Sequence, residues 1–173
     1  MAGPSAYLEV ARTAGAVYVR VMGYGSFAVA RPMREFAEAC IREGQRQLVL
    51  DLSGARSIDS TFMGTVAALC SAVDPAGEGT GWIQVVNANA QCAKVMGDVG
   101  LEKLVRVRDE PVAVPDIPRT RLDPELGTPA ERLHTAADAH RRLLPLDPEN
   151  ERRFRPVLQL LDKELAALAQ RGQ

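Results

Sequence analysis

The sequence predicts an α/β fold: a mostly parallel sheet with an antiparallel or mixed edge, helices packed against it, and a C-terminal helical hairpin. Two observations lead to this prediction. Strand-like apolar segments alternate with amphipathic helical segments up to residue 107, in the order that crossover connections between parallel strands produce. A proline-rich stretch then separates two further helical segments from the rest.

The expected strands differ in character along the chain. Residues 7–12 and 16–22 alternate apolar and polar side chains around a short turn, which is typical of a hairpin or of two neighbouring strands. Residues 47–52 and 82–88 are almost continuously apolar, which favours strands covered on both faces and therefore central ones. The stretch "LEKLVRV" leads from a helix into a last edge strand.

Three helices are expected between these strands. Apolar side chains recur at helical spacing over residues 29–44, where Gly44 is placed to end the helix. A second helix follows Ser60 and stops at Pro75 and the glycines after it. A third, short helix ends near Gly97.

The chain is expected to divide into three parts. Residues 5–112 form the domain that holds the sheet, residues 113–127 a proline-rich linker in extended conformation, and residues 128–171 a helical hairpin. The hairpin opens with Thr128-Pro129-Ala130-Glu131, which combines an N-cap, a proline at the first helical position and a capping-box glutamate. Pro156 is expected to kink the final helix or to force a restart there.

The final helix presents an apolar stripe that must be covered. The stripe consists of Phe154, Val157, Leu158, Leu161, Leu165 and Leu168. The first helix of the hairpin has too small an apolar face to cover it, so the cover has to come from the main domain or from a second copy of the chain. The linker is long enough for both arrangements. We expect the hairpin to dock and to help form a homodimer.

Composition and charge exclude several classes of partner. The formal net charge is −1, with 21 Lys and Arg against 22 Asp and Glu, so the chain lacks the basic field of a nucleic-acid-binding protein. No apolar run approaches the roughly 18 residues of a membrane span. The N-terminus "MAGPSAYLEV" lacks the charged start and apolar core of a signal peptide. We therefore expect a cytoplasmic protein without direct contacts to nucleic acid or membrane.

Metal and catalytic chemistry find no support in the sequence. Three cysteines, Cys40, Cys70 and Cys92, lie in apolar or helical stretches without C-x-x-C spacing, which favours buried thiols. His134 and His140 are six residues apart, not at the i,i+4 spacing that pairs metal ligands, so no metal or other cofactor is expected. Both histidines lie in the hairpin, outside the domain of Ser60, so a Ser-His nucleophile is set aside and no enzymatic activity is expected.

Polar residues at the start of the second helix call for an explanation of their own. Asp59 or Ser60 can cap the helix, a contact worth about 1 kcal/mol. A phosphate at the same place would also be tolerated, because the free amides and the dipole of a helix N-terminus favour an anion. Next to Asp59 on a docking face, however, that phosphate would repel a partner. Asp59 and Ser60 can therefore be interpreted either as a structural helix cap or as part of a phosphorylation switch that controls partner binding.

Residues 7–108 resemble a STAS domain, the module of anti-sigma factor antagonists and of the cytoplasmic tails of sulfate transporters. The resemblance rests on the strand order and on "VMGYGSFAV", "LVLDLSGARSIDSTFMGTVAAL" and "NANAQCAKVMGDVGLEKLVRV". In soluble members the hydroxyl after the Asp is phosphorylated by a partner kinase that is also the anti-sigma factor, and that position here is Ser60. Thr61 offers a second hydroxyl. Where antagonists often carry an Asp after the glycine of the second strand, this chain has Ser26.

The resemblance implies a non-enzymatic bacterial partner-switching regulator that acts in transcription regulation. Its partners would be an anti-sigma factor or serine kinase and a serine phosphatase, with Ser60 or Thr61 as the phosphorylated residue. The residues expected to contact the partner are Tyr24, Ser26, Asp59, Phe62 and Met63. The alternative is a constitutive STAS scaffold or oligomerisation subunit of a signalling complex, in which Ser60 is only a cap. A third possibility is a ligand or nucleotide sensor with a cleft at the C-terminal ends of the parallel strands.

Overall fold

The computed structural model describes residues 6–171 of the chain. Residues 1–5 lie outside the described residues. They include the predicted domain start at residue 5 and the first half of "MAGPSAYLEV", on which the expectation of no signal peptide rests.

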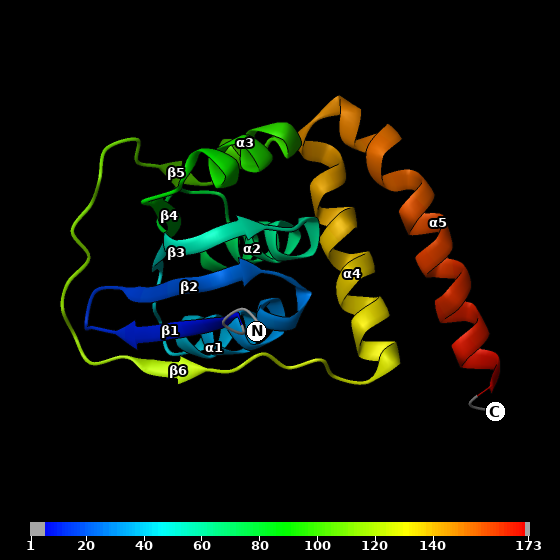
Figure 1. The fold of residues 1–173 in the computed structure, drawn as a ribbon, viewed down its shortest axis with the longest axis horizontal. Coiled ribbons are helices and arrows are strands. Elements are labelled where there is room, and N and C mark those ends of the chain that lie inside the picture. The colour runs from blue at the N-terminus through cyan, green and yellow to red at the C-terminus, as the bar shows by residue number, and fades with distance from the viewer. Residues whose placement is uncertain (1–5, 172–173) are drawn as a thin grey trace, which may run out of the picture.

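A six-stranded mixed sheet forms the centre of the molecule (Figure 1). Its strand order is β5-β4-β3-β2-β1-β6. Strands β2 to β5 pair in parallel, whereas β1 pairs antiparallel with both β2 and β6. The predicted fold class is therefore confirmed. The strands are β1 (Tyr7–Arg12), β2 (Val17–Gly25), β3 (Gln47–Ile58), β4 (Trp82–Val86), β5 (Arg106–Val107) and β6 (Thr120–Leu122).

The helices lie in layers on one side of this sheet. Helices α1 and α2 pack between the sheet and α4, and α5 lies beyond α4 (Figure 1). A single core fills the space between sheet and helices, with Leu50 from β3, Met33 from α1 and Phe62 from α2 fully or almost fully buried. The helices are α1 (Phe27–Arg42), α2 (Ser60–Val73), α3 (Ala90–Val99), α4 (Pro129–Leu143) and α5 (Pro148–Arg171), with short 3₁₀ turns at Leu101–Lys103 and Leu144–Leu146.

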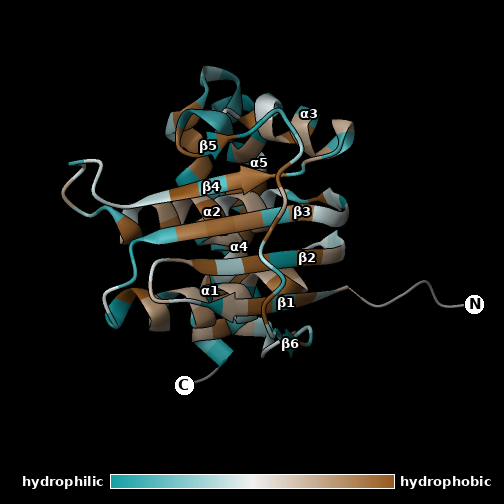
Figure 2. Ribbon diagram, turned by 90° about the vertical axis from the view of Figure 1, so that its left-hand side faces the viewer, coloured by the Kyte–Doolittle hydropathy of each residue, from teal (hydrophilic) through white to brown (hydrophobic). Residues whose placement is uncertain are grey.

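The opposite side of the sheet is crossed by residues 108–119, which connect β5 to β6 (Figure 2). Beneath this segment the carboxylate of Asp51 is almost fully buried and accepts hydrogen bonds from Arg20 Nε at 2.7 Å and from Asn87 Nδ2 at 3.1 Å. Asn87 also exchanges two hydrogen bonds with the backbone of Val112. Burial opposes ionisation of Asp51, but the combined hydrogen bonds of Arg20, Asn87 and Ser53 outweigh it and lower its pKa. Asn87 thus ties the crossing segment to a buried carboxylate.

Two sequence predictions need correction. The stretch expected to be an extended linker, residues 113–127, contains β6, which pairs with β1 and adds an antiparallel strand at the edge of the sheet. Helix α5 runs from Pro148 to Arg171, so Pro156 does not force a restart, and the kink that was the other expected effect stays a prediction. Pro156 and Arg152 both lie on the exposed side of α5, so the Arg152 carbonyl that loses its helical donor faces water.

Other expected elements are confirmed, with shifted ends. Strand β3 continues to Ile58, six residues past its predicted end, and α1 begins at Phe27 because Ser26 caps it. Thr128 and Glu131 form the predicted capping box at the start of α4. Cys40 and Cys92 are buried free thiols as predicted, whereas Cys70 is half-buried.

Replacing Asn87 by glycine should loosen residues 108–119 while the sheet stays intact. Asn87 has a φ of 56°, which glycine adopts readily, so the substitution removes the side-chain hydrogen bonds without adding backbone strain. The loss of these bonds should lower the free energy of unfolding by about 2 kcal/mol in urea denaturation. Amide exchange at Val112 should accelerate. An unchanged exchange rate at Val112 would contradict the assigned role of Asn87.

Candidate functional site

The candidate site lies at the N-terminus of α2, where Asp59 is the capping residue. Asp59 Oδ1 accepts a hydrogen bond from the Phe62 amide at 2.8 Å, and Oδ2 accepts one from the Phe27 amide at 3.2 Å. One carboxylate therefore satisfies amides at the N-terminal ends of two helices, α1 and α2. Burial raises the pKa of Asp59, although these amide bonds act in the opposite direction. Since Asp59 is the cap, the hydroxyl of Ser60 is not needed for that purpose.

The Ser60 hydroxyl instead contacts a residue of the hairpin. Ser60 Oγ lies 2.9 Å from Nε2 of His140 on α4. This contact joins positions 80 residues apart in the chain. It contradicts the expectation that no histidine lies near Ser60, because α4 folds back over the N-terminal half of α2. The ring of His140 is 7% exposed and lies 5.0 Å from the ring of Phe154 on α5.

The geometry does not amount to a catalytic Ser-His pair. Among the described residues, Nδ1 of His140 has no hydrogen-bond partner, so no third group orients the ring. The nearby carboxylate of Asp59 is engaged by backbone amides. Burial lowers the pKa of His140, so the ring is neutral at pH 7. The imidazole serves here as a hydrogen-bonding group within a helix contact.

The other predicted site residues divide into exposed and buried ones. Tyr24 is 48% exposed at the end of β2, and Ser26 caps α1 by accepting a hydrogen bond from the Ala28 amide at 3.3 Å. Thr61 and Met63 are buried, the latter beneath the hairpin next to Phe154. Phe62 is 0% exposed, so the prediction that it contacts a partner is wrong for this conformation. Its side chain belongs to the core between α2 and the sheet.

Sequence reasoning missed two residues of this region. His140 was left out because it lies outside the segment that resembles a STAS domain. Phe27, which is 39% exposed beside Tyr24, was left out because the helix was expected to begin later. One signal points to the cover over Ser60: residues 60–73 contain no charged side chain and are apolar nearly all round, which is typical of a helix that is covered on every side.

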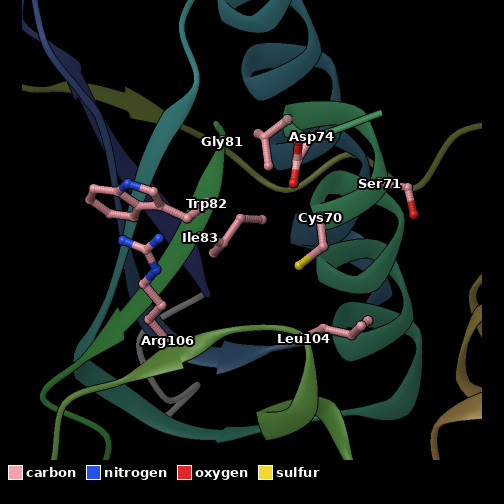
Figure 3. A pocket seen from close by; sticks show the side chains of 9 residues that line it. Cys70, Ser71, Asp74, Gly81, Trp82, Ile83, Leu104 and Arg106 are labelled. Carbon is pink, nitrogen blue, oxygen red and sulfur yellow. The ribbon is translucent and has the colours of Figure 1, made fainter. Parts of the chain in front are cut away.

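The opposite end of α2 holds a hollow of about 320 Å³ (Figure 3). Its lining includes Cys70, Trp82, Leu104 and Arg106. Burial raises the pKa of Cys70 to about 12, which keeps its thiol protonated and unreactive. The Arg106 guanidinium lies 4.9 Å from the centre of the Trp82 ring, against which it stacks. Ser71 and Asp74 also line this hollow, and the Asp74 carboxylate accepts hydrogen bonds from the amides of Glu78 and Gly79 and from the Thr80 hydroxyl.

Across residues 6–171, no group of three or more His, Cys, Asp or Glu side chains is placed to hold a metal ion. None of the helices in the described part of the chain combines the length and apolar character that crossing a bilayer requires.

The model of a protein family, the Mlab, STAS domain, matches residues 8–106 of the chain. The chain belongs to the STAS domain family. The matched residues end before β6, so α4 and α5 lie outside them. A search of curated proteins returned no match.

Two solved structures share the fold of the STAS domain. One is an anti-sigma factor antagonist from Mycobacterium paratuberculosis, 22% identical, with a TM-score of 0.52 over 64% of this chain and 92% of that chain. The other is a candidate anti-sigma factor antagonist from Thermotoga maritima, 18% identical, with a TM-score of 0.53 over 60% of this chain and 86% of that chain. At these identities the likeness establishes the fold.

The burial of His140 predicts a pH dependence of stability. The unfolded chain, with a histidine pKa of about 6.5, binds the proton before the folded chain does, so His140 should reduce stability as the pH falls below about 6.5. Asp59 acts with the opposite sign, because its raised pKa lets the folded state take up the proton first. The comparison of wild type with His140→Gln should isolate the contribution of His140.

Thermal unfolding at pH 7.5 and pH 5.5 provides the measurement. The wild type should lose more stability over this interval than His140→Gln, which keeps a polar side chain but does not titrate. Equal losses in the two proteins would show that His140 is not buried as described.

Proposed function

We propose that this STAS protein is a partner-switching regulator of the anti-sigma factor antagonist type, controlled by phosphorylation of Ser60. The observation that carries the proposal is that Asp59 and Ser60 have different roles at the start of α2. Asp59 caps the helix, and the adjacent Ser60 hydroxyl makes no capping bond. A phosphate on Ser60 would meet the positive end of the helix dipole. The protein would bind an anti-sigma factor or serine kinase, and a serine phosphatase would reverse the modification.

The burial of the two candidate hydroxyls favours Ser60 over Thr61. Ser60 is half-buried and borders an open hollow with Met63 and Arg153. Thr61 is 7% exposed and lies within the first turn of α2. A kinase could reach the Thr61 hydroxyl only by unwinding that turn. Thr61 therefore remains the second choice.

The surface around Ser60 supports a protein partner. Tyr24 and Phe27 are exposed aromatic side chains at the joined ends of β2 and α1, and Asp59 connects that junction to α2. Exposed aromatic residues beside a polar centre are typical of interface cores. We propose Tyr24, Ser26, Phe27 and Asp59 as residues of the partner surface. Met63, which the hairpin covers, would join this surface if a partner displaced the hairpin.

We also propose, as the resemblance to STAS regulators implies, a non-enzymatic, cytoplasmic protein without a cofactor. The only histidine beside Ser60 in the described part of the chain lacks an orienting partner on its second nitrogen, and the regulatory role needs no chemistry from the chain itself.

We further propose residues 5–112 as the STAS unit, joined through 113–127 to the hairpin of residues 128–171. The match of the family model to residues 8–106 supports the first boundary.

The alternative is a constitutive scaffold or oligomerisation subunit without a phospho-switch. The contact between Ser60 and His140 is the observation in its favour, because a hydroxyl bonded to a buried ring can have a purely structural role. The two proposals differ in whether Ser60 carries phosphate in the cell.

Bait proteins that differ only at Ser60 should separate the two proposals. Full-length Ser60→Ala and Ser60→Asp proteins, together with Thr61→Ala as the matched control, would be used to capture partners from the native cytoplasm. We expect a histidine-kinase-like ATPase on the Ser60→Ala and Thr61→Ala baits and at least about tenfold less on Ser60→Asp, because the added carboxylate repels the partner beside Asp59. Mass spectrometry of the wild type should find phosphate on Ser60.

Two outcomes would contradict the phospho-switch. Unmodified Ser60 under every growth condition, with equal capture by all three baits, would support the scaffold. Phosphate on Thr61 alone would move the switch to the buried hydroxyl.

We also propose that α5 contributes to a homodimer. Phe154 and Leu158 of the predicted stripe are buried, whereas Val157 and Leu160 are 39% and 59% exposed on the outer side of α5. A second copy would cover these side chains.

Leu160→Glu should therefore shift the protein from dimer to monomer, because a charge on that face would be buried without a partner. Light scattering of wild type and variant at matched concentration gives the mass. A Lys163→Glu control, which changes a charged residue of the same helix, should leave the dimer intact. Equal masses for wild type and Leu160→Glu would contradict the dimer.

A further inference from the structure

The part of the proposed partner surface around Ser60 and Met63 is already covered by the chain's own helix α4. His140 of α4 lies against the Ser60 hydroxyl, and Ala139 on the same helix is buried against Gly64 of α2. In Figure 1, α4 runs across the N-terminal end of α2, with α5 on its outer side. A kinase that holds the Ser60 hydroxyl in its active site would have to take the place of His140.

The backbones of the two helices meet at Gly64. A Cβ built on Gly64 would lie 2.2 Å from the carbonyl oxygen of Ala139 and 2.5 Å from its Cα. The backbones of α2 and α4 are therefore in direct contact one turn after Ser60. No side chain of a partner could enter between them, and the two helices have to separate before another protein can reach this part of α2.

The contacts that hold α4 in place are mixed in strength. On the side of α1, Arg31 pairs with Glu131 at 3.0 Å and Arg34 pairs with Asp138 at 3.2 Å, all four side chains being partly exposed. Exposed ion pairs of this kind contribute little to stability. The buried ring of His140 adds a hydrogen bond to the Ser60 hydroxyl to these contacts.

The end of the hairpin nearest α3 is held more firmly. Asn150 is fully buried, and its Nδ2 donates to the carbonyls of Val99 at 2.9 Å and Leu143 at 2.7 Å. Leu143 and Phe154 are buried in the core cluster at the same end. The hairpin is thus anchored by buried hydrogen bonds where α4 meets α5, whereas its polar contacts along the rest of α4 are exposed ion pairs and the contact between Ser60 and His140. This distribution allows α4 to move away from α2 while the anchored end keeps it close.

We propose that the α4–α5 hairpin is an intramolecular gate over Ser60, and that a partner binds by placing a helix of its own in the position of α4. This inference rests on the proposed function and specifies its regulation. The exposed strip of α2 would offer Gly64 and Met63 to the incoming helix, so that helix should carry a small residue at the crossing, as α4 does with Ala139. The gate and the partner compete for one surface.

Thiol accessibility at position 60 tests the gate without any kinase. Full-length Ser60→Cys would be treated with N-ethylmaleimide, alone and combined with Gly64→Ala. The atoms nearest to the added methyl group belong to the backbone of Ala139, and alanine otherwise favours the α2 helix, so the substitution should act by pushing α4 away. Gly15→Ala, where the added Cβ meets nothing within 4 Å, is the matched control. The wild-type protein, treated in the same way, gives the background from the native cysteines.

We expect the introduced thiol to be alkylated about tenfold faster in the Gly64→Ala background and at an unchanged rate in the Gly15→Ala background. Amide exchange should accelerate in α4 and remain slow in β3, which shows that the domain is still folded. Equal alkylation rates in all backgrounds would overturn the gate. The same holds if the introduced thiol of the Ser60→Cys single variant reacts as fast as a denatured thiol.

A second variant keeps the test decisive should Gly64→Ala fail to fold. Asp138→Arg replaces the partner of Arg34 and Arg142 with a like charge on the exposed side of α4 and leaves the core untouched. It should raise the alkylation rate by about twofold at low salt, and an unchanged rate would count against the gate. Absence of phosphate from Ser60 in cells would remove the proposed switch but leave these rates unaffected, so the two proposals can fail separately.

Discussion

The contact of two helix backbones at Gly64 and Ala139 determines which surface this protein presents. Because α4 can approach so closely only over a residue without a side chain, the crossing fixes both the position of α4 and the depth at which His140 meets Ser60. The burial of Met63 and the packing of α5 against α4 follow from the same crossing. A STAS domain that would otherwise leave this side of α2 in water therefore carries its own cover.

The chemistry of the candidate site follows from how its polar groups are shared. Asp59 accepts hydrogen bonds from amides of both α1 and α2, which fixes the junction of the two helices. The Ser60 hydroxyl is therefore not needed to cap either helix. His140 takes up the hydroxyl of Ser60 but is itself buried with one nitrogen unpaired among the described residues. The helix cap formed by Asp59 is thus held rigidly, and helix α4, which covers Ser60, is held less stably. This difference suits a surface that has to become exposed.

The sequence was sufficient for the elements but not for the way distant parts meet. Alternating and continuous apolar runs identified β1 to β4, and the Asp59-Ser60 pair at a helix start identified the site, because these signals are local. Strand β6 was missed since three residues between prolines acquire strand geometry only by pairing with β1. The docking of α4 was missed because no local pattern encodes which surface a helix will meet. The absence of charge from residues 60–73 is a sequence signal for a second cover over α2, but it was not used in the prediction.

The central claim is that α4 lies on α2 over Ser60 in the free protein, and nuclear Overhauser contacts in the full-length chain test it most directly. With Gly64 and Ala139 backbones in contact, the account predicts a strong cross-peak between the α-protons of Gly64 and the backbone or methyl protons of Ala139. It also predicts contacts between the His140 and Phe154 rings. Absence of the cross-peak between Gly64 and Ala139, in a protein whose α2 and α4 signals are both assigned and helical, would contradict the account.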